Sequence, residues 1–197
     1  MKHLMNFILS MVFLTSVPAI AADIDASKLS KKKQTTLGLY LDAKSAHKSV
    51  AANPNKVLFV DVRTPAEIEF VGAPKVIDAN VPYMLNDFSE WDGKKKRFKK
   101  MPNSNFTISM EEHLESKGLT KNDKVILMCR SGSRSAKAVN LLHKAGYKNV
   151  YSVVDGFEGD KSKSAATKGQ RVVNGWKNSN LPWTYKHEEV KMYVSFN

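Results

Sequence analysis

The residues best suited to covalent chemistry lie between positions 129 and 135. The segment reads Cys129-Arg130-Ser131-Gly132-Ser133-Arg134-Ser135, and Cys129 is the single cysteine of the chain. A strand-like apolar run leads into Cys129, and a helix is predicted to start at about Arg134. A helix N-terminus offers unpaired N–H groups and a favourable dipole to an anion, and nearby arginines add positive charge. The pattern therefore predicts a nucleophilic thiolate in a cationic loop.

The small residues of this loop indicate what it could hold. Ser131, Gly132 and Ser133 let the backbone turn its N–H groups inward as an anion-binding nest, and Gly132 can adopt a positive φ. Two chemistries use such a loop, one through a cysteinyl phosphate and one through a cysteinyl persulfide. Four residues separate Cys129 from Arg134, whereas cysteine phosphatases have five. The segment resembles the shorter loop of the rhodanese-like sulfurtransferases, which fits a persulfide sulfur.

The resemblance to the rhodanese-like family covers roughly residues 37–160. Val60-Asp61-Val62-Arg63, followed by Pro65-Ala66-Glu67, is similar to the family's Asp-Val-Arg signature. Asp155-Gly156-Phe157 resembles its Gly-Gly-Phe motif, and residues 174–183 resemble the ending of single-domain exported members. Gly72 is followed by Ala73-Pro74 where members carry Gly-His-Ile, so we expect the local loop geometry to differ there.

The resemblance implies a thiosulfate sulfurtransferase-type enzyme that needs no cofactor. Cys129 would take a sulfane sulfur from thiosulfate or a similar donor and pass it to a thiol or cyanide. The residues implied to bind the substrate are Arg130, Ser131, Gly132, Ser133 and Arg134. The supporting residues would be Asp61, Arg63 and Ser135, with Asp61 paired to Arg134 and Arg63 in a structural role.

Three alternatives stay open. The chain could be a persulfide carrier that does not turn over, or a docking module. It could instead be a cysteine-dependent phosphatase or arsenate reductase built on the same loop. Cys129 could also be a buried, inert thiol, although the arginines beside it favour a thiol exposed for its chemistry.

The elements around the loop predict an α/β fold. Short apolar runs typical of buried strands occur at 57–60, 76–77, 125–128 and 150–154. Helical patterns occur at 40–50, 65–71, 108–116 and 134–145. Thr64 and Glu67 have the spacing of a capping box at the start of the second helix. This alternation predicts an open parallel sheet flanked by helices on both faces.

Two segments extend this predicted domain of residues 37–160. Residues 84–108 interrupt the pattern, and positions 94–100 carry six positive charges in seven residues. We expect a surface insertion loop that is solvated, with an anionic docking site as the alternative. Residues 161–197 form a predicted extension that packs onto the domain through Trp176 and Trp183.

The first residues predict export. Residues 1–21 combine a positive start, a short apolar run and an Ala19-Ile20-Ala21 end, which is the plan of a cleaved secretory signal peptide. A polar lead-in at 22–36 follows. The formal net charge is +12, and removal of the one lysine in the signal leaves about +11. We therefore expect a periplasmic protein without a membrane span, and small sulfur-containing anions or a protein sulfur acceptor as partners rather than nucleic acid. The histidine spacing indicates no metal site.

Overall fold

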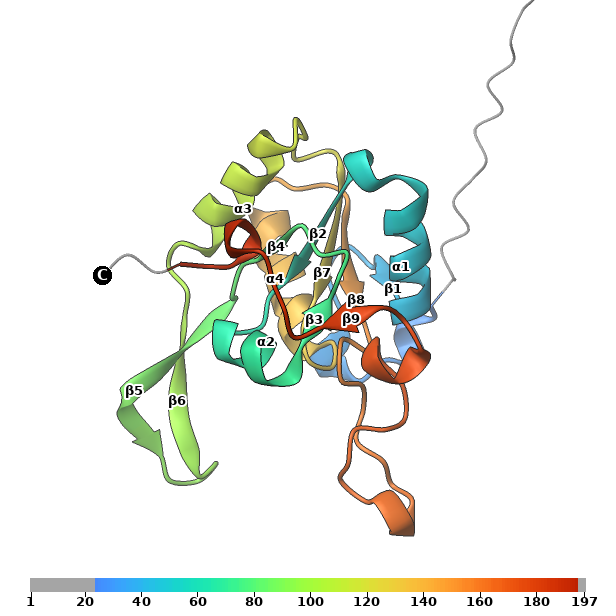
Figure 1. The fold of residues 1–197 in the computed structure, drawn as a ribbon, viewed down its shortest axis with the longest axis vertical. Helices are drawn as coiled ribbons and strands as arrows, with labels where there is room; N and C mark the ends of the chain where they lie inside the picture. Colours follow the sequence, from blue (N-terminus) through green and yellow to red (C-terminus); the bar gives the residue numbers. More distant parts are fainter. Residues whose placement is uncertain (1–23, 195–197) are drawn as a thin grey trace, which may run out of the picture.

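The centre of the computed structural model, which describes residues 24–194, is a five-stranded sheet in the order β1-β8-β7-β2-β4 (Figure 1). All neighbouring strands of this sheet are parallel. The strands are β1 Tyr40–Leu41, β2 Val57–Asp61, β4 Ala79–Asn80, β7 Lys124–Met128 and β8 Val150–Val153. The predicted α/β class and parallel sheet are confirmed, and β7 lies in the middle of the sheet.

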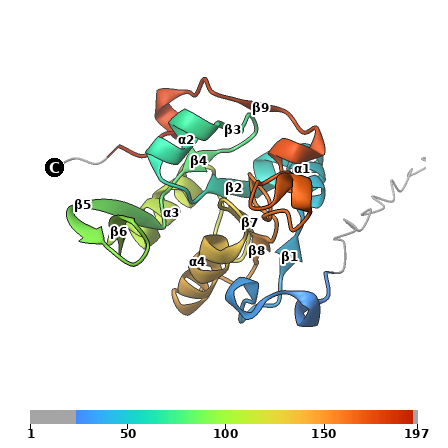
Figure 2. The same ribbon diagram turned by 90° about the horizontal axis from the view of Figure 1, so that it is seen from below.

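Four helices cover the two faces of the sheet, as the sequence predicts. They are α1 Ala43–Ala52, α2 Pro65–Val71, α3 Phe106–Ser116 and α4 Ser133–Lys144. One buried cluster joins α3 and α4 to alternate residues of β2 and β7, such as Val60 and Leu127. A second cluster joins α1 and α2 to the intervening residues, such as Phe59 and Ile126. Figure 2 shows the two helix layers on opposite sides of the sheet. This alternation is why the strands read as continuous apolar runs.

The pairing of β2 with β7 sets where Cys129 and the loop after it lie relative to Asp61. Val57 pairs with Lys124 and Asp61 with Met128, so the two strands end at the same level. The carboxyl ends of parallel strands form the edge where ligands bind in open α/β sheets. Asp61 and Cys129 are therefore brought to one edge.

The insertion at 84–108 is a β-hairpin and not the loop that the sequence predicts. Strand β5 (Met84–Asp92) pairs antiparallel with β6 (Arg97–Pro102), and α3 begins at Phe106. Asp87 lies opposite Lys99 across the two strands, so opposite charges face each other. The ring centroids of Trp91 and Phe98 lie 5.3 Å apart. Such cross-strand pairs stabilise a strand that has no apolar alternation.

Two boundaries of the predicted elements are wrong. Residues 76–77 form no strand, because the Asp78 carboxylate accepts a hydrogen bond from the Phe59 N–H (2.7 Å), and strand pairing begins only at Ala79. Tyr40 and Leu41 belong to strand β1 rather than to the first helix, which starts after the N-cap Asp42.

The segment after β8 returns across the sheet. Trp176 is fully buried and stacks on Phe59, with ring centroids 5.4 Å apart. Strand β9 (Trp183–Thr184) then pairs antiparallel with β3 (Ala73–Pro74). The part of the chain that the structure describes also contains six short 3-10 helices: Ala26–Lys28, Lys31–Lys33, Pro54–Lys56, Ala165–Thr167, Lys177–Ser179 and Glu189–Lys191.

The predicted signal peptide, residues 1–21, lies outside the described residues. Among residues 24–194, no helix has the length and apolar character needed to cross a membrane.

Candidate active site

The backbone between β7 and α4 forms a tight loop around Cys129. Cys129 follows β7 directly, and α4 begins at Ser133. Gly132 is the N-cap of α4 and has the expected positive φ, 91°. A Cβ atom on Gly132 would lie 2.2 Å from the carbonyl oxygen of Val154, so the loop packs against the end of β8. This contact leaves no room for any residue but glycine.

The Cys129 thiol is buried beneath this loop, and the expectation of an exposed thiol is wrong. Its side chain has 1% exposure, and Sγ lies 3.6 Å from the Ser135 hydroxyl oxygen. Ser135 Oγ donates to the carbonyl of Gly132 (3.1 Å) and lies 2.9 Å from Ser152 Oγ. The thiol thus lies at the junction of the apolar core and a short chain of hydroxyl groups, and its S–H donates to the Ser135 oxygen.

The segment after β8 holds the loop by its carbonyl groups. The N–H of Phe157 donates to the carbonyl of Cys129 (2.8 Å), and the N–H groups of Glu158 and Gly159 donate to that of Arg130 (3.0 and 3.3 Å). Gly156 makes this approach possible, because its absent Cβ would lie 2.4 Å from the Cys129 oxygen. Within residues 24–194, the N–H groups of Arg130, Ser131 and Gly132 donate to no backbone acceptor. The loop therefore keeps N–H donors for an anion while the carbonyls of Cys129 and Arg130 are occupied.

Arg134 pairs with Glu67 and not with Asp61, which corrects the predicted partner. Its two terminal nitrogens each lie 2.6 Å from a Glu67 oxygen. Glu67 also accepts from the N–H of Thr64, so the predicted capping box of α2 is confirmed and joined to the loop. Burial alone would raise the pKa of Glu67, but the hydrogen bonds and charge of Arg134 lower it to about 2. The ion pair ties the start of α2 to the start of α4.

Asp61 instead pairs with Arg63, two residues away. Arg63 donates to both Asp61 oxygens (2.6–3.0 Å) and to the carbonyl of Gly72 (2.8 Å). Its guanidinium stacks 4.2 Å from the centre of the Phe157 ring, and both charged side chains are fully buried. Because Phe157 also holds the Cys129 carbonyl, this pair supports the loop from below.

A pocket of about 560 Å³ adjoins the loop on its solvent side. Its walls include Arg130, Ser133 and Arg134 from the loop region and Lys100 from the hairpin β5–β6. Five of the six cations at positions 94–100 are exposed to solvent, and part of the hairpin also lines the pocket beside the predicted active loop.

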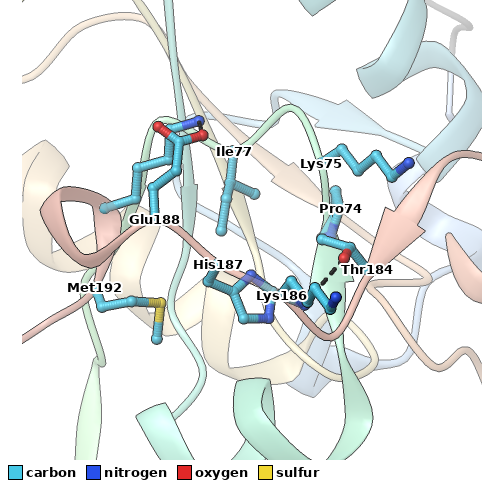
Figure 3. Close-up of a pocket in the computed structure, with 9 residues that line it drawn as sticks. Pro74, Lys75, Ile77, Thr184, Lys186, His187, Glu188 and Met192 are labelled. Atoms are coloured by element: carbon cyan, nitrogen blue, oxygen red, sulfur yellow. Dashed lines mark hydrogen bonds and ion pairs between the residues drawn. The ribbon is translucent and has the colours of Figure 1, made fainter.

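A second pocket, of about 230 Å³, lies elsewhere and shares no lining residue with the loop. Figure 3 shows Ile77 from the segment before β4 and His187 and Met192 from the C-terminal segment around it. Burial lowers the pKa of His187, whose Nε2 has no hydrogen-bond partner in the described part of the chain. No group of three metal-ligating side chains occurs within residues 24–194.

The sequence missed three residues of the site. Glu67 was read only as a helix cap, and its reach to Arg134 spans 67 positions of sequence. Ser152 could have been noticed in the sequence, because it is a hydroxyl residue inside the apolar strand β8. In the structure its hydroxyl lies next to that of Ser135. Nothing in the sequence distinguishes Lys100 from the other lysines at positions 94–100.

The sequence pattern of the Rhodanese-like domain matches residues 42–163. An uncharacterized protein of Rickettsia prowazekii is 31% identical, over 66% of this chain and 85% of that protein. Thiosulfate sulfurtransferase 16, a chloroplastic protein of Arabidopsis thaliana, is 33% identical over 56% of this chain and 78% of its own length. The crystal structure of Rv0390 from M. tuberculosis superposes with a TM-score of 0.53 and 28% identity, covering 74% of this chain and 96% of that one.

Proposed function

This chain belongs to the Rhodanese-like domain family, and we propose that it is a sulfurtransferase that carries sulfur as a persulfide on Cys129. The observation that carries the proposal is the loop itself. Cys129 Sγ lies at its base beside Ser135. Residues 157–159 bind the carbonyls of Cys129 and Arg130, and the N–H groups of residues 130–132 are left for an anion. A persulfide formed on Cys129 would be such an anion.

The proposed cycle has two displacement steps. The Cys129 thiolate attacks the outer sulfur of thiosulfate, the S–S bond of the donor breaks, and sulfite leaves with the bonding electron pair. An acceptor thiolate or cyanide then attacks the outer sulfur of the persulfide and releases the Cys129 thiolate. No external oxidant or reductant is consumed. Because sulfite leaves before the acceptor reacts with the persulfide intermediate, ping-pong kinetics are expected.

The two arginines of the loop have different parts in this scheme. Arg130 is exposed and forms no salt bridge within the described residues, so its guanidinium is free to hold the leaving sulfite. Arg134 is held by Glu67 and contributes its charge from a fixed position. We also retain the proposal of export, since residues 1–21 have the signal-peptide pattern.

Intact-mass spectrometry after incubation with thiosulfate tests the proposal. We expect a gain of one sulfur atom on the full chain, its loss with cyanide as thiocyanate, and no gain in a Cys129→Ser variant. An unchanged mass after both thiosulfate and polysulfide treatment, in buffer free of reductant, would show that the proposal is wrong.

A persulfide carrier remains the second candidate, because the 1% exposure of Cys129 restricts the approach of a small acceptor. Repeated turnover of thiosulfate with cyanide separates the two. A catalyst releases many thiocyanate ions per chain, whereas a carrier releases a single equivalent.

A further inference from the structure

The pocket beside the active loop has an unusual balance of charge. Its cationic lining residues are Lys95, Arg97, Lys99, Lys100, Arg130, Arg134 and Lys137, and its acidic ones are Glu67 and Asp92. Both carboxylates are already used: Glu67 pairs with Arg134 and Asp92 with Lys95. Lys99 pairs with Glu90 on the same hairpin. Within residues 24–194, four lining cations are left without a carboxylate partner.

These four cations come from three separate elements. Arg97 and Lys100 belong to β6, Arg130 to the loop after β7, and Lys137 to α4. Burial lowers the pKa of Lys100; Glu67 opposes this shift, and the positive charges of Arg134, Arg97 and Arg130 add to it. Because Lys100 and Arg97 line the same pocket as Arg130 and Arg134, the hairpin brings its positive charge close to the loop. Repulsion among them is relieved when an anion enters.

The size of the pocket indicates what kind of anion that is. A volume of about 560 Å³ falls in the range of pockets for small organic molecules, about 300–1,000 Å³. Thiosulfate is a small ion that would fill only part of this volume, and the loop N–H groups and Arg130 are enough to hold it. A larger molecule with its sulfur in the loop and its anionic groups on the hairpin would use both sets of contacts.

We propose that the pocket binds an organic thiol with two or more carboxylate groups, which takes sulfur from Cys129. This rests on the proposed sulfurtransferase function and names its acceptor class. Arg97 and Lys100 hold the carboxylates while the thiolate attacks the outer persulfide sulfur. The S–S bond breaks, Cys129 leaves as a thiolate, and the acceptor becomes a persulfide, so no other reactant is needed. The hairpin is then the element that selects the acceptor.

The test uses the full chain, loaded with sulfur, and three thiols of increasing charge. They are 2-mercaptoethanol, mercaptoacetate and mercaptosuccinate, and the rate of sulfur loss from Cys129 is followed by mass. A double variant, Arg97→Gln with Lys100→Gln, removes the two hairpin cations. A matched control, Lys94→Gln with Lys96→Gln, makes the same charge change on the same hairpin at residues that do not line the pocket. Comparing each variant with the unaltered chain for each thiol cancels the intrinsic reactivity of the thiol.

We expect the pocket variant to lose about tenfold or more in rate with mercaptosuccinate, which corresponds to one or two charge-assisted contacts. Its rate with 2-mercaptoethanol should stay within about twofold, and the control should stay within about twofold for all three thiols. Equal decreases in rate in both variants would mean that the net charge of the hairpin, rather than these two side chains, is responsible. Equal decreases for all three thiols would mean that the pocket does not recognise carboxylates. Either result overturns the proposal.

A binding measurement separates this proposal from the proposed function. Mercaptosuccinate is titrated calorimetrically into the Cys129→Ser chain with and without the two pocket substitutions. Binding that depends on Arg97 and Lys100 supports the pocket even if the unaltered chain never takes up sulfur. Sulfur loading without any such binding overturns the pocket and leaves the sulfurtransferase proposal standing. Supplying the persulfide of mercaptosuccinate as donor shows whether the same site also works in the reverse direction.

Discussion

Arg134 and Glu67 form a two-pronged ion pair, with two N–O distances of 2.6 Å, that joins the first turns of α4 and α2. Both side chains are mostly shielded from water, with 15% and 21% exposure. The Glu67 carboxylate also accepts the N–H of Thr64, the N-cap of α2. One carboxylate thus fixes a helix start and the orientation of an arginine in the candidate active loop.

Replacing Glu67 by glutamine should therefore destabilise the protein by about 2 to 3 kcal/mol at pH 7, as a partly buried charge pair is broken. Because the pKa of Glu67 is lowered from 4.5 to about 2, the carboxylate stabilises the fold fully above pH 4.5. This contribution is lost as the pH falls from 4.5 to 2. Urea unfolding of both proteins across this range should show the stability difference shrinking toward low pH.

The exposed Glu69 on the same helix provides the control. Glu69→Gln should change the free energy of unfolding by less than about 0.5 kcal/mol. A stability difference for Glu67→Gln that does not vary with pH would show that its carboxylate is not held as an ion.

Gly132→Ala should disrupt the loop. The added methyl would meet the Val154 carbonyl at 2.2 Å and would occupy a φ of 91°. We expect a loss of about 3 kcal/mol or more and little persulfide on Cys129, because strain and overpacking act together. Gly169→Ala, where φ is 86° and no atom lies within 4 Å, should cost only about 1 to 2 kcal/mol. Thermal unfolding and mass analysis measure both effects; similar losses in the two variants would refute the steric argument.

Asp155 gives a pH dependence of opposite sign. Burial raises its pKa to about 6, although the N–H groups of Ala43 and Gly175 oppose the shift by donating to it. The folded state then holds a proton that the unfolded state releases near pH 3.8, so this group makes stability fall as the pH rises from 3.8 to 6.

Asparagine does not titrate, so the stability of Asp155→Asn relative to the unaltered protein should rise by about 2 to 3 kcal/mol from pH 4 to pH 7. Denaturant unfolding at several pH values measures this. Asp123→Asn is the control and should show almost no change from pH 4 to pH 7, since hydrogen bonds from Thr120 lower the pKa of Asp123 and place its pH dependence below 3.8. A flat difference for Asp155→Asn would mean that Asp155 is ionised throughout the range.

Trp176→Ala should cost about 3 to 5 kcal/mol, the usual effect of removing a large buried aromatic side chain. Trp176 is fully buried between Phe59 and His47, with both ring centroids 5.4 Å away. Trp91→Ala is the matched control, because Trp91 is 57% exposed on the hairpin. Chemical denaturation of both variants checks the prediction, and equal costs would show that Trp176 is not part of the core.

The sequence predicted best what short-range patterns determine. The apolar run of β7, the capping box of Thr64 and Glu67, and the positive φ of Gly132 each depend on a few neighbouring residues. The parallel sheet followed from the alternation of such elements. These features are confirmed.

Pairings between distant residues were not predictable in the same way. From the sequence, either Arg63 or Arg134 could pair with Asp61. The structure shows that Arg63 donates to Asp61, whereas Arg134 donates to Glu67. The hairpin was read as a loop because its strands carry charges where strands usually alternate apolar and polar residues. Its stability comes from partners across the two strands, which no local window contains.

The buried position of Trp176 has a consequence for the order in which the fold can be completed. The sheet is complete once β8 has been made, yet the face covered by α1 stays open until residue 176 and the strand β9 arrive. A chain truncated before residue 176 would therefore keep every strand of the sheet but expose Phe59 and its neighbours on that face.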